Sequence, residues 1–327
     1  EGYELWKSDG TEAGTVMVKN INPYSVNCAT SNACSSNASY LTPIGNTLYF
    51  VAEDGTNGKE LWKSDGTASG TVMVKDIKSG SPSSLMTIFG VMGNTLYFSA
   101  DDGTNAYELW KSDGTTSGTV MVKDINSGGG SSLFYTYAFD STIVGNTLYF
   151  RADDGVHGNE LWKSDGTTSG TVMVKDLFNG SSTGYPQQLT ALGNTLYFIA
   201  RNGTIDNLGN FIDDGEGYEL WKSDGTEAGT VMVKNINPYS VNCATSNACN
   251  SNATYLTPVG NTLYFSADDG TNGRELWKSD GTETGTVMVK DINSGNATSL
   301  PNWMTAVGNT LYFSAEDPTH GRELWKR

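Results

Sequence analysis

The stretch Glu4-Leu-Trp-Lys-Ser-Asp-Gly-Thr11 decides the fold of this chain, because it recurs along the whole sequence. The steps between successive copies are 56, 48, 52, 59, 56 and 48 residues. Repeats of this length fit one small β-sheet per copy, and each sheet then buries its apolar faces against its neighbours. Full copies begin at Glu4, Glu60, Glu108, Glu160, Glu219 and Glu275, and a partial copy covers residues 323–327.

The copies also form a larger repeat. Residues 1–63 and 216–278 are nearly identical, so the sequence also repeats with a period of four copies. We interpret residues 1–327 as a single repeat domain, since the core of a repeat array grows with the number of copies. We also expect the chain to be a piece of a longer array, because it begins and ends inside a repeat.

One copy predicts four antiparallel strands. Residues 261–267 carry apolar side chains at both odd and even positions, which indicates a strand covered on both faces. Residues 275–278 and 286–292 predict two further strands, separated by turn-forming Asp, Gly, Asn and Thr residues. A weaker apolar stretch that ends at Val307 supplies the remaining strand, and no segment has a helical period.

The expected fold class is all-β, and within it a β-propeller of six blades with four antiparallel strands each. Sheets that are apolar on both faces must stack on one another. A closed arrangement hides the two end sheets, which would otherwise favour aggregation. The alternative is an open linear β-repeat array or a different number of blades.

The composition limits the binding partners and the cellular location that we expect for this chain. A net charge of −16 and a pI near 4.4 argue against nucleic acid or an anionic membrane surface as a partner. No apolar run reaches the ~18 residues of a membrane-spanning helix, so membrane insertion is not expected. Four cysteines in two copies of one short loop suggest two local disulfides and an oxidising, extracellular location; they are Cys28 with Cys34 and Cys243 with Cys249. A metal site is the alternative, but no further His or Cys lies nearby.

The recurring Glu-Leu-Trp-Lys-Ser-Asp-Gly-Thr stretch, together with Gly-Thr-Val-Met-Val-Lys, resembles the ELWxxDGT repeat family of large secreted or cell-surface bacterial proteins, also called hyalin-like. The resemblance extends over the whole chain. It implies an extracellular β-propeller-type repeat protein of largely unassigned biochemical role, and it supplies no catalytic residues.

The variable residues predict where a partner would bind. In a four-stranded meander the Gly-Asn and Ser-Asp-Gly-Thr turns lie at one end, and they hardly vary between copies. The variation gathers at the opposite end, where we expect ligand binding by Phe134, Tyr135, Tyr137, Phe139, Tyr185 and Trp303. The motif tryptophans are an alternative sugar-stacking surface, but a Trp repeated in every copy favours packing between blades.

Calcium is the one cofactor that the sequence suggests. Acidic turns such as Asp268-Asp269-Gly270 could supply oxygen ligands, although ordinary turn chemistry is the favoured interpretation. The densest group of hard ligands lies in an insertion and comprises Asp206, Asn207, Asn210, Asp213 and Asp214.

The expected function is a non-enzymatic extracellular scaffold or adhesion module with a variable binding face. Its expected partners are glycans or cell-surface proteins and the neighbouring repeats of a longer chain. A lectin-like carbohydrate-binding propeller is the alternative, and a calcium-dependent or glycosidase-like protein is less favoured. Catalysis is not expected, because most ionisable residues recur in register, whereas an active site needs an asymmetric group; the two histidines, His157 and His320, share one turn position.

Overall fold

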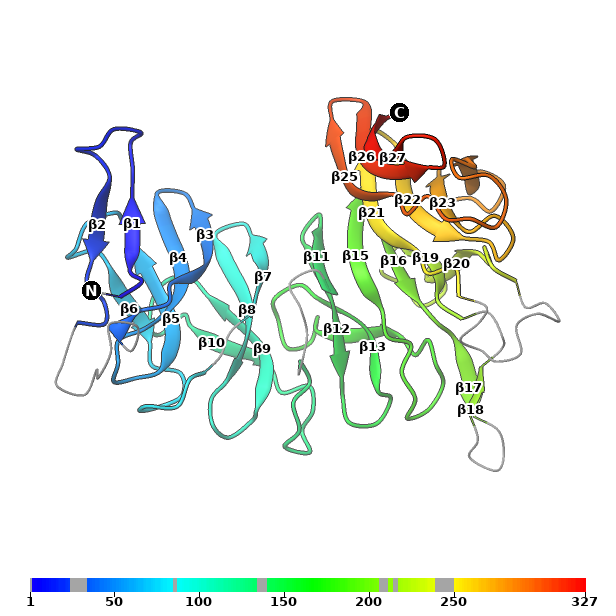
Figure 1. Ribbon diagram of the computed structural model, residues 1–327. Coiled ribbons are helices and arrows are strands. Elements are labelled where there is room, and N and C mark those ends of the chain that lie inside the picture. Colours follow the sequence, from blue (N-terminus) through cyan, green and yellow to red (C-terminus); the bar gives the residue numbers. More distant parts are fainter. Residues whose placement is uncertain are drawn as a thin grey trace. The chain divides into compact units, whose positions relative to one another are not determined.

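A computed structural model describes residues 2–23, 34–84, 87–133, 140–205, 211–213, 217–238 and 250–327. The elements in these ranges are β-strands, so the described chain is all-β (Figure 1). The residues form two compact units. Unit 1 comprises Glu1–Ala138 with Gly166–Thr168, and unit 2 comprises Phe139–Asp165 with Ser169–Arg327. No helix among the described residues is both long and apolar enough to cross a membrane.

Unit 1 contains three antiparallel sheets whose strands follow one another in sequence order. The first has two strands, β1 (Leu5–Lys7) and β2 (Val16–Lys19). The second has four strands, which are β3 (Ser39–Ile44), β4 (Thr47–Glu53), β5 (Lys59–Ser64) and β6 (Val72–Lys75). The third also has four, which are β7 (Thr87–Met92), β8 (Thr95–Asp101), β9 (Tyr107–Ser112) and β10 (Val120–Lys123).

Unit 2 continues the same plan with four sheets. The first contains β11 (Ser141–Val144), β12 (Thr147–Asp153), β13 (Asn159–Ser164) and β14 (Val172–Lys175). The second contains β15 (Gln187–Leu192), β16 (Thr195–Ala200), β19 (Glu219–Ser223) and β20 (Val231–Lys234). The third contains β21 (Thr254–Val259), β22 (Thr262–Asp268), β23 (Arg274–Ser279) and β24 (Val287–Lys290). The last has three strands, β25 (Asn302–Val307), β26 (Thr310–Asp317) and β27 (Gly321–Lys326).

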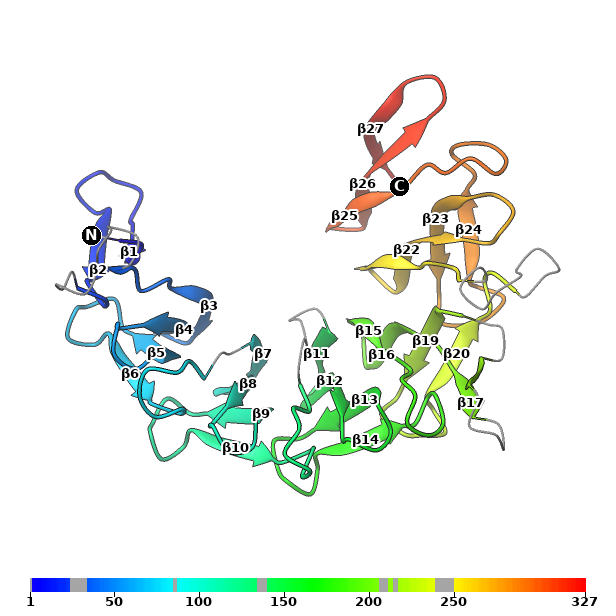
Figure 2. The ribbon, with the colours of Figure 1, turned by 60° about the horizontal axis from the view of Figure 1, so that its bottom comes forward.

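The insertion between β16 and β19 forms a small hairpin of its own. Its strands are β17 (Gly203–Ile205) and β18 (Phe211–Asp213), which pair only with each other among the named strands (Figure 2). The hairpin joins the second strand of its sheet to the third, so it lies at the end of the sheet where the sequence varies most.

The all-β, propeller-type fold expected from the sequence is confirmed. The number of complete blades differs from the expected six: the described residues give five four-stranded sheets, with a two-stranded sheet before them and a three-stranded sheet after them. Each Gly-Asn pair makes the expected two-residue hairpin turn. Gly260 and Gly308, for example, have φ of 57° and 59°, which a hairpin turn of this kind requires at its first central position.

The motif tryptophans of the five four-stranded sheets pack between sheets, as predicted, whereas Trp6 of the two-stranded sheet is exposed. Trp277 of β23 contacts Leu220, Val233 and Ile236 of the preceding sheet and is 6% exposed. The motif lysine also bridges the two sheets, since Lys222 Nζ donates to the Gly281 carbonyl at 2.8 Å. These contacts bury the apolar faces that single sheets would leave in water. The tryptophans therefore do not form a sugar-stacking surface.

The motif glutamates hold the connection from their own sheet to the next one. Glu219 is fully buried, and its carboxylate accepts hydrogen bonds from the backbone N–H groups of Ile236 at 3.0 Å and Ser251 at 3.1 Å. Burial raises the pKa of Glu219 to about 8, because the charged form loses hydration that these bonds only partly replace. Glu219 therefore anchors the connection that leads from β20 to β21 of the next sheet.

Candidate binding site on the leading strands of unit 2

The first strand of each four-stranded or three-stranded sheet, here called the leading strand, is an edge strand of that sheet. In β15, β21 and β25 the pairing with the next strand shifts just after the first residue, which makes a bulge in each. The residues at these bulges are Gln188, Tyr255 and Trp303, with φ of 54°, 61° and 51°. We call these three residues the bulge row.

A left-handed backbone is uncommon for large side chains, so its repetition in register needs a physical cause. Part of that cause is a threonine two residues later. The Thr257 hydroxyl donates to the Tyr255 carbonyl at 2.8 Å, and the Thr190 hydroxyl donates to the Gln188 carbonyl at 2.9 Å. Each bond fixes the bulge carbonyl locally.

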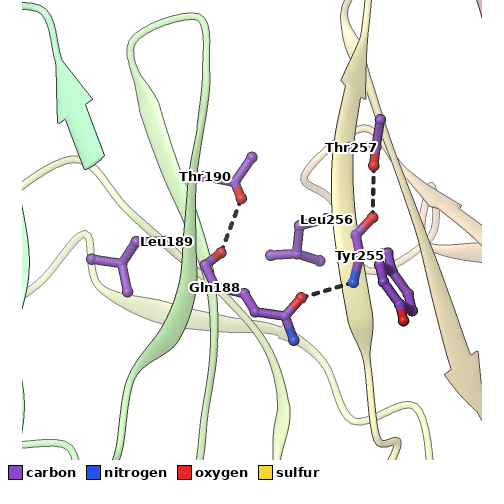
Figure 3. Close-up of a pocket in the computed structure, with 6 residues that line it drawn as sticks. All are labelled: Gln188, Leu189, Thr190, Tyr255, Leu256 and Thr257. Atoms are coloured by element: carbon purple, nitrogen blue, oxygen red, sulfur yellow. Dashed lines mark hydrogen bonds between the residues drawn. The ribbon is translucent and has the colours of Figure 1, made fainter. Parts of the chain in front are cut away.

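Gln188 links two neighbouring leading strands (Figure 3). Its Oε1 accepts the Tyr255 N–H at 2.7 Å, and its Nε2 donates to the Ala253 carbonyl at 3.4 Å. The side-chain amide thus occupies backbone groups that the bulge of β21 leaves unpaired with β22. This contact holds β15 and β21 at a fixed spacing.

A cavity of ≈ 210 Å³ lies between these two strands. Leu256 points across the gap toward β15, whereas the Tyr255 ring lies on the other side of β21 (Figure 3). The cavity combines apolar walls with hydroxyl and amide groups that are already hydrogen-bonded. Its lining residues are Gln188, Leu189, Thr190, Tyr255, Leu256 and Thr257.

Beyond the cavity, the bulge row exposes two aromatic side chains. Tyr255 is 42% exposed and Trp303 is 76% exposed, and their strands β21 and β25 contact each other. Large aromatic groups left in water on a rigid strand are well suited to bind a partner, because little conformational entropy is lost on contact.

An arginine accompanies Tyr255. Arg274, the first residue of β23, donates from Nη1 to the Thr254 hydroxyl at 3.1 Å. Burial lowers the pKa of the Arg274 guanidinium, and the nearby Asp268 and Tyr255 side chains act in the opposite direction.

The structure describes two of the six residues predicted to bind a ligand. Trp303 belongs to the bulge row. Tyr185 does not: its ring lies over the guanidinium of Arg151, 4.2 Å from Cζ, and Arg151 forms a buried ion pair with Asp140 at 2.9 Å. Tyr185 therefore covers a structural ion pair. The other four, Phe134, Tyr135, Tyr137 and Phe139, lie outside the described residues.

Sequence reasoning missed Gln188, Tyr255 and Arg274. A signal for the first two exists, because the bulge residue is followed by Leu or Met and then Thr in each case. The pattern reads Tyr40-Leu-Thr, Gln188-Leu-Thr, Tyr255-Leu-Thr and Trp303-Met-Thr. Nothing in this pattern identifies Arg274, which comes from a different strand.

The carboxylates of the acidic turns bond to groups of the turn itself, as the favoured interpretation of ordinary turn chemistry predicts. In the turn that begins at Asp269, one carboxylate oxygen accepts the N–H groups of Thr271 at 2.9 Å and Asn272 at 2.8 Å, and the other accepts the Asn272 side-chain amide at 2.8 Å. These bonds are ordinary turn chemistry.

Of the predicted calcium ligands, Asp213 lies at the end of β18, and Asp206, Asn207, Asn210 and Asp214 lie outside the described residues. Across the described part of the chain, His, Cys, Asp and Glu form no group of three or more suited to a metal.

One predicted disulfide residue is described. Cys34 is buried and disulfide-bonded. Cys28, Cys243 and Cys249 lie outside the described residues, so the pairing of the four cysteines stays a prediction.

No family model matches the chain, and no curated protein matches it, so the resemblance to the ELWxxDGT repeat family stays a prediction. Several solved structures are similar in fold. One prolyl endopeptidase is 13% identical, with 88% of this chain and 39% of that chain covered at a TM-score of 0.44. Prolyl oligopeptidase B from Galerina marginata is 8% identical, with 96% and 42% covered at a TM-score of 0.49. The β-propeller domain of the Trilobed protease from Pyrococcus furiosus is 12% identical, with 89% and 81% covered at a TM-score of 0.44.

At these identities the likeness concerns the fold alone, and this chain spans well under half of the two prolyl peptidases. The three structures named here are two prolyl peptidases and the propeller domain of a protease, and none of the three is an adhesion protein or a lectin. The expectation of a non-enzymatic extracellular scaffold or adhesion module, with a lectin as its alternative, was therefore wrong.

Proposed function

We propose that this chain is a polypeptide-binding domain and that the bulge row of unit 2 is its binding surface. The observation that carries the proposal is the bulge row. Three neighbouring edge strands each hold a large side chain in a left-handed backbone, and two of these side chains are left exposed aromatics. The proposal does not rest on the peptidase comparisons.

The chemistry of the surface favours an extended polypeptide. Edge strands interrupted by bulges offer backbone hydrogen-bonding groups, and polypeptides bind such edges through their own backbone. Tyr255 and Trp303 add flat apolar area beside these groups. The net charge of −16 attracts a basic segment from a distance and speeds its encounter.

The test is a binding titration with fluorescein-labelled, lysine-rich extended peptides, measured by fluorescence anisotropy. We expect Trp303→Ala and Tyr255→Ala each to weaken binding about tenfold or more, as for aromatic residues central to an interface. Trp6→Ala is the matched control, since Trp6 is an exposed tryptophan in unit 1, outside the bulge row. Absence of binding, or wild-type affinity in Trp303→Ala, would contradict the proposal.

We also propose that the chain is exported to an oxidising compartment. The support is Cys34, which is disulfide-bonded and buried. Alkylation of the native protein before reduction, followed by mass spectrometry, should find Cys34 protected from the reagent. A Cys34 thiol that becomes labelled in unfolded, unreduced protein would contradict this assignment.

A further inference from the structure

Arg274 is a cation whose guanidinium makes one hydrogen bond among the described residues. It is half-buried at the start of β23, beside the bulge of β21. Its guanidinium donates to the Thr254 hydroxyl at 3.1 Å. A guanidinium carries five N–H donors in a rigid, planar arrangement that fits a carboxylate.

Within the described residues, Arg274 takes part in none of the ion pairs, which are formed by other cations. The residue opposite it in the sheet is Asp268. One carboxylate oxygen of Asp268 accepts the Gly270 N–H at 2.7 Å and so belongs to the adjoining turn. Asp268 acts electrostatically on Arg274, but the two form no ion pair among the described residues. The planar guanidinium therefore has donors with which it can pair a second carboxylate.

Tyr255 completes the surroundings of Arg274. Its side chain interacts electrostatically with the guanidinium. Its backbone is fixed by Gln188, whose Oε1 accepts the Tyr255 N–H at 2.7 Å. Arg274 is bonded to Thr254, the residue before Tyr255, so its guanidinium lies near the start of β21 and next to the bulge row.

We infer that Arg274 and Tyr255 form a carboxylate subsite within the polypeptide-binding surface, at which an acidic side chain or the C-terminal carboxylate of the bound polypeptide docks. This inference rests on the proposed function and specifies one chemical group of its ligand. The guanidinium provides paired N–H donors to the carboxylate, and the Tyr255 hydroxyl provides a further donor.

The chain itself offers a matched comparison. In the nearly identical stretch of unit 1, Lys59 stands where Arg274 stands in unit 2, and Tyr40 corresponds to Tyr255. A lysine ammonium is a point charge without the two-pronged geometry of a guanidinium. Arg274→Lys therefore introduces the residue that the matching sheet of unit 1 already contains. Lost binding in this variant would then not reflect misfolding.

The first experiment needs no peptide. N-acetylglycine, a small carboxylate, and N-acetylglycinamide, its neutral analogue, are titrated separately into the 327-residue chain, and the Nε–Hε signal of Arg274 is followed by NMR. We expect the carboxylate to shift this signal in a saturable way and the amide to leave it in place. Equal responses to the two compounds would overturn the subsite.

The second experiment uses one labelled lysine-rich peptide in three forms: with a free C-terminal carboxylate, with a C-terminal amide, and with the amide plus one internal Glu. We expect one carboxylate form to bind about tenfold more tightly than the plain amide, and the form that does so identifies the source of the carboxylate. Arg274→Gln should abolish this preference, and Arg274→Lys should reduce it about threefold.

The outcomes separate the two proposals. If all three peptides bind equally and Arg274→Gln changes nothing, the subsite is wrong and the polypeptide-binding surface stands. If no peptide binds while N-acetylglycine still shifts the Arg274 signal, the polypeptide-binding function is wrong and the carboxylate subsite stands.

Discussion

Residues 1–63 of unit 1 and 216–278 of unit 2 are nearly identical in sequence, but their side chains do not have the same surroundings. Trp221 is 4% exposed and packs with Tyr149, Leu161 and Val174 of the preceding sheet. Its counterpart Trp6 is 58% exposed. The comparison shows that the repeat specifies a sheet, whereas a neighbouring sheet decides which of its faces is buried.

The leading strands show the same contrast. Leu256 of β21 packs against the core cluster that contains Ile199 and Phe265. Its counterpart Leu41 of β3 is 55% exposed. The backbone is the same in both, since Tyr40 and Tyr255 both have positive φ. The bulge is therefore a local property, and the burial around it is not.

The largest expected difference between the two copies is at the motif tryptophan. Trp221→Ala should lower the free energy of unfolding by about 3–5 kcal/mol, because it removes a buried indole from a packed contact between sheets. Trp6→Ala should cost less than about 1 kcal/mol, as for an exposed side chain. Urea denaturation of both variants, followed by circular dichroism, measures the two values. Similar losses would mean that Trp6 is as well packed as Trp221.

The next effect is a dependence on pH that Glu219 creates. Its pKa is raised to about 8 from an ordinary value of 4.5, so the folded state binds a proton that the unfolded state has released. The resulting stabilisation is fully present below pH 4.5 and is lost as the pH rises through 8. As the pH rises from 4.5 to 8, this titration should lower the free energy of unfolding by on the order of 5 kcal/mol.

Glu219→Gln removes this titration and should reduce the slope of unfolding free energy against pH between 5 and 8, as measured by urea denaturation at several pH values. A slope remains, because burial also raises the pKa of Glu60 and Glu108 to about 7 and that of Glu160 to about 8. The charge repulsion among the remaining carboxylates is nearly unchanged in this variant. The difference in slope between the wild type and the variant therefore reports the titration of Glu219. An unchanged slope would show that Glu219 titrates near its ordinary pKa in the folded state.

A smaller loss of stability, on substitution of a turn glycine, should be equal in the two copies. A Cβ on Gly229 would come within 2.1 Å of Asp224 Oδ1, and one on Gly14 within 2.0 Å of Asp9 Oδ1. Gly229→Ala and Gly14→Ala should each cost about 1–2 kcal/mol, because the Asp carboxylate must leave its bonds to the following Thr. Thermal unfolding of both variants provides the measurement. Clearly unequal costs would show that the turn depends on its neighbours.

The smallest expected effect concerns the lysine bridge. Lys222→Met removes the partly buried bond from Nζ to the Gly281 carbonyl at 2.8 Å and should cost about 1 kcal/mol. Lys7→Met removes the exposed counterpart, from Nζ to the Gly66 carbonyl at 2.9 Å, and should be close to neutral, since water replaces it. Denaturation midpoints compare the two, and an equal loss would assign the same strength to both bridges.

The sequence allowed the sheets to be predicted because their causes are local. The turn at Asp224 depends on bonds to Thr226 only two residues away, and Thr226 in turn accepts the N–H of Gly229. The packing of the motif Trp in the four-stranded sheets also followed from the repetition, because the same residues recur in the sheet that precedes each of them. The number of complete sheets was less predictable, since a partial copy supplies fewer strands than a full one.

The binding site depended on contacts that the sequence could not show. Trp303 was predicted from its variability and its aromatic ring, and it does lie in the bulge row. Tyr185 is also aromatic, but its ring covers the buried Arg151. Other copies have a small or aliphatic residue at the position of Arg151. Whether an aromatic side chain covers an ion pair or faces water is set by residues far away in sequence.

The sequence by itself determined the strands, the turns and the apolar faces, because hydrogen bonds between residues close along the chain and the alternation of side chains fix them. Only the tertiary structure decided which faces are buried, where Gln188 meets Tyr255, and that Arg274 forms no ion pair among the described residues. These features arise where separate sheets approach one another, and the side chains that meet there are separated by a whole repeat.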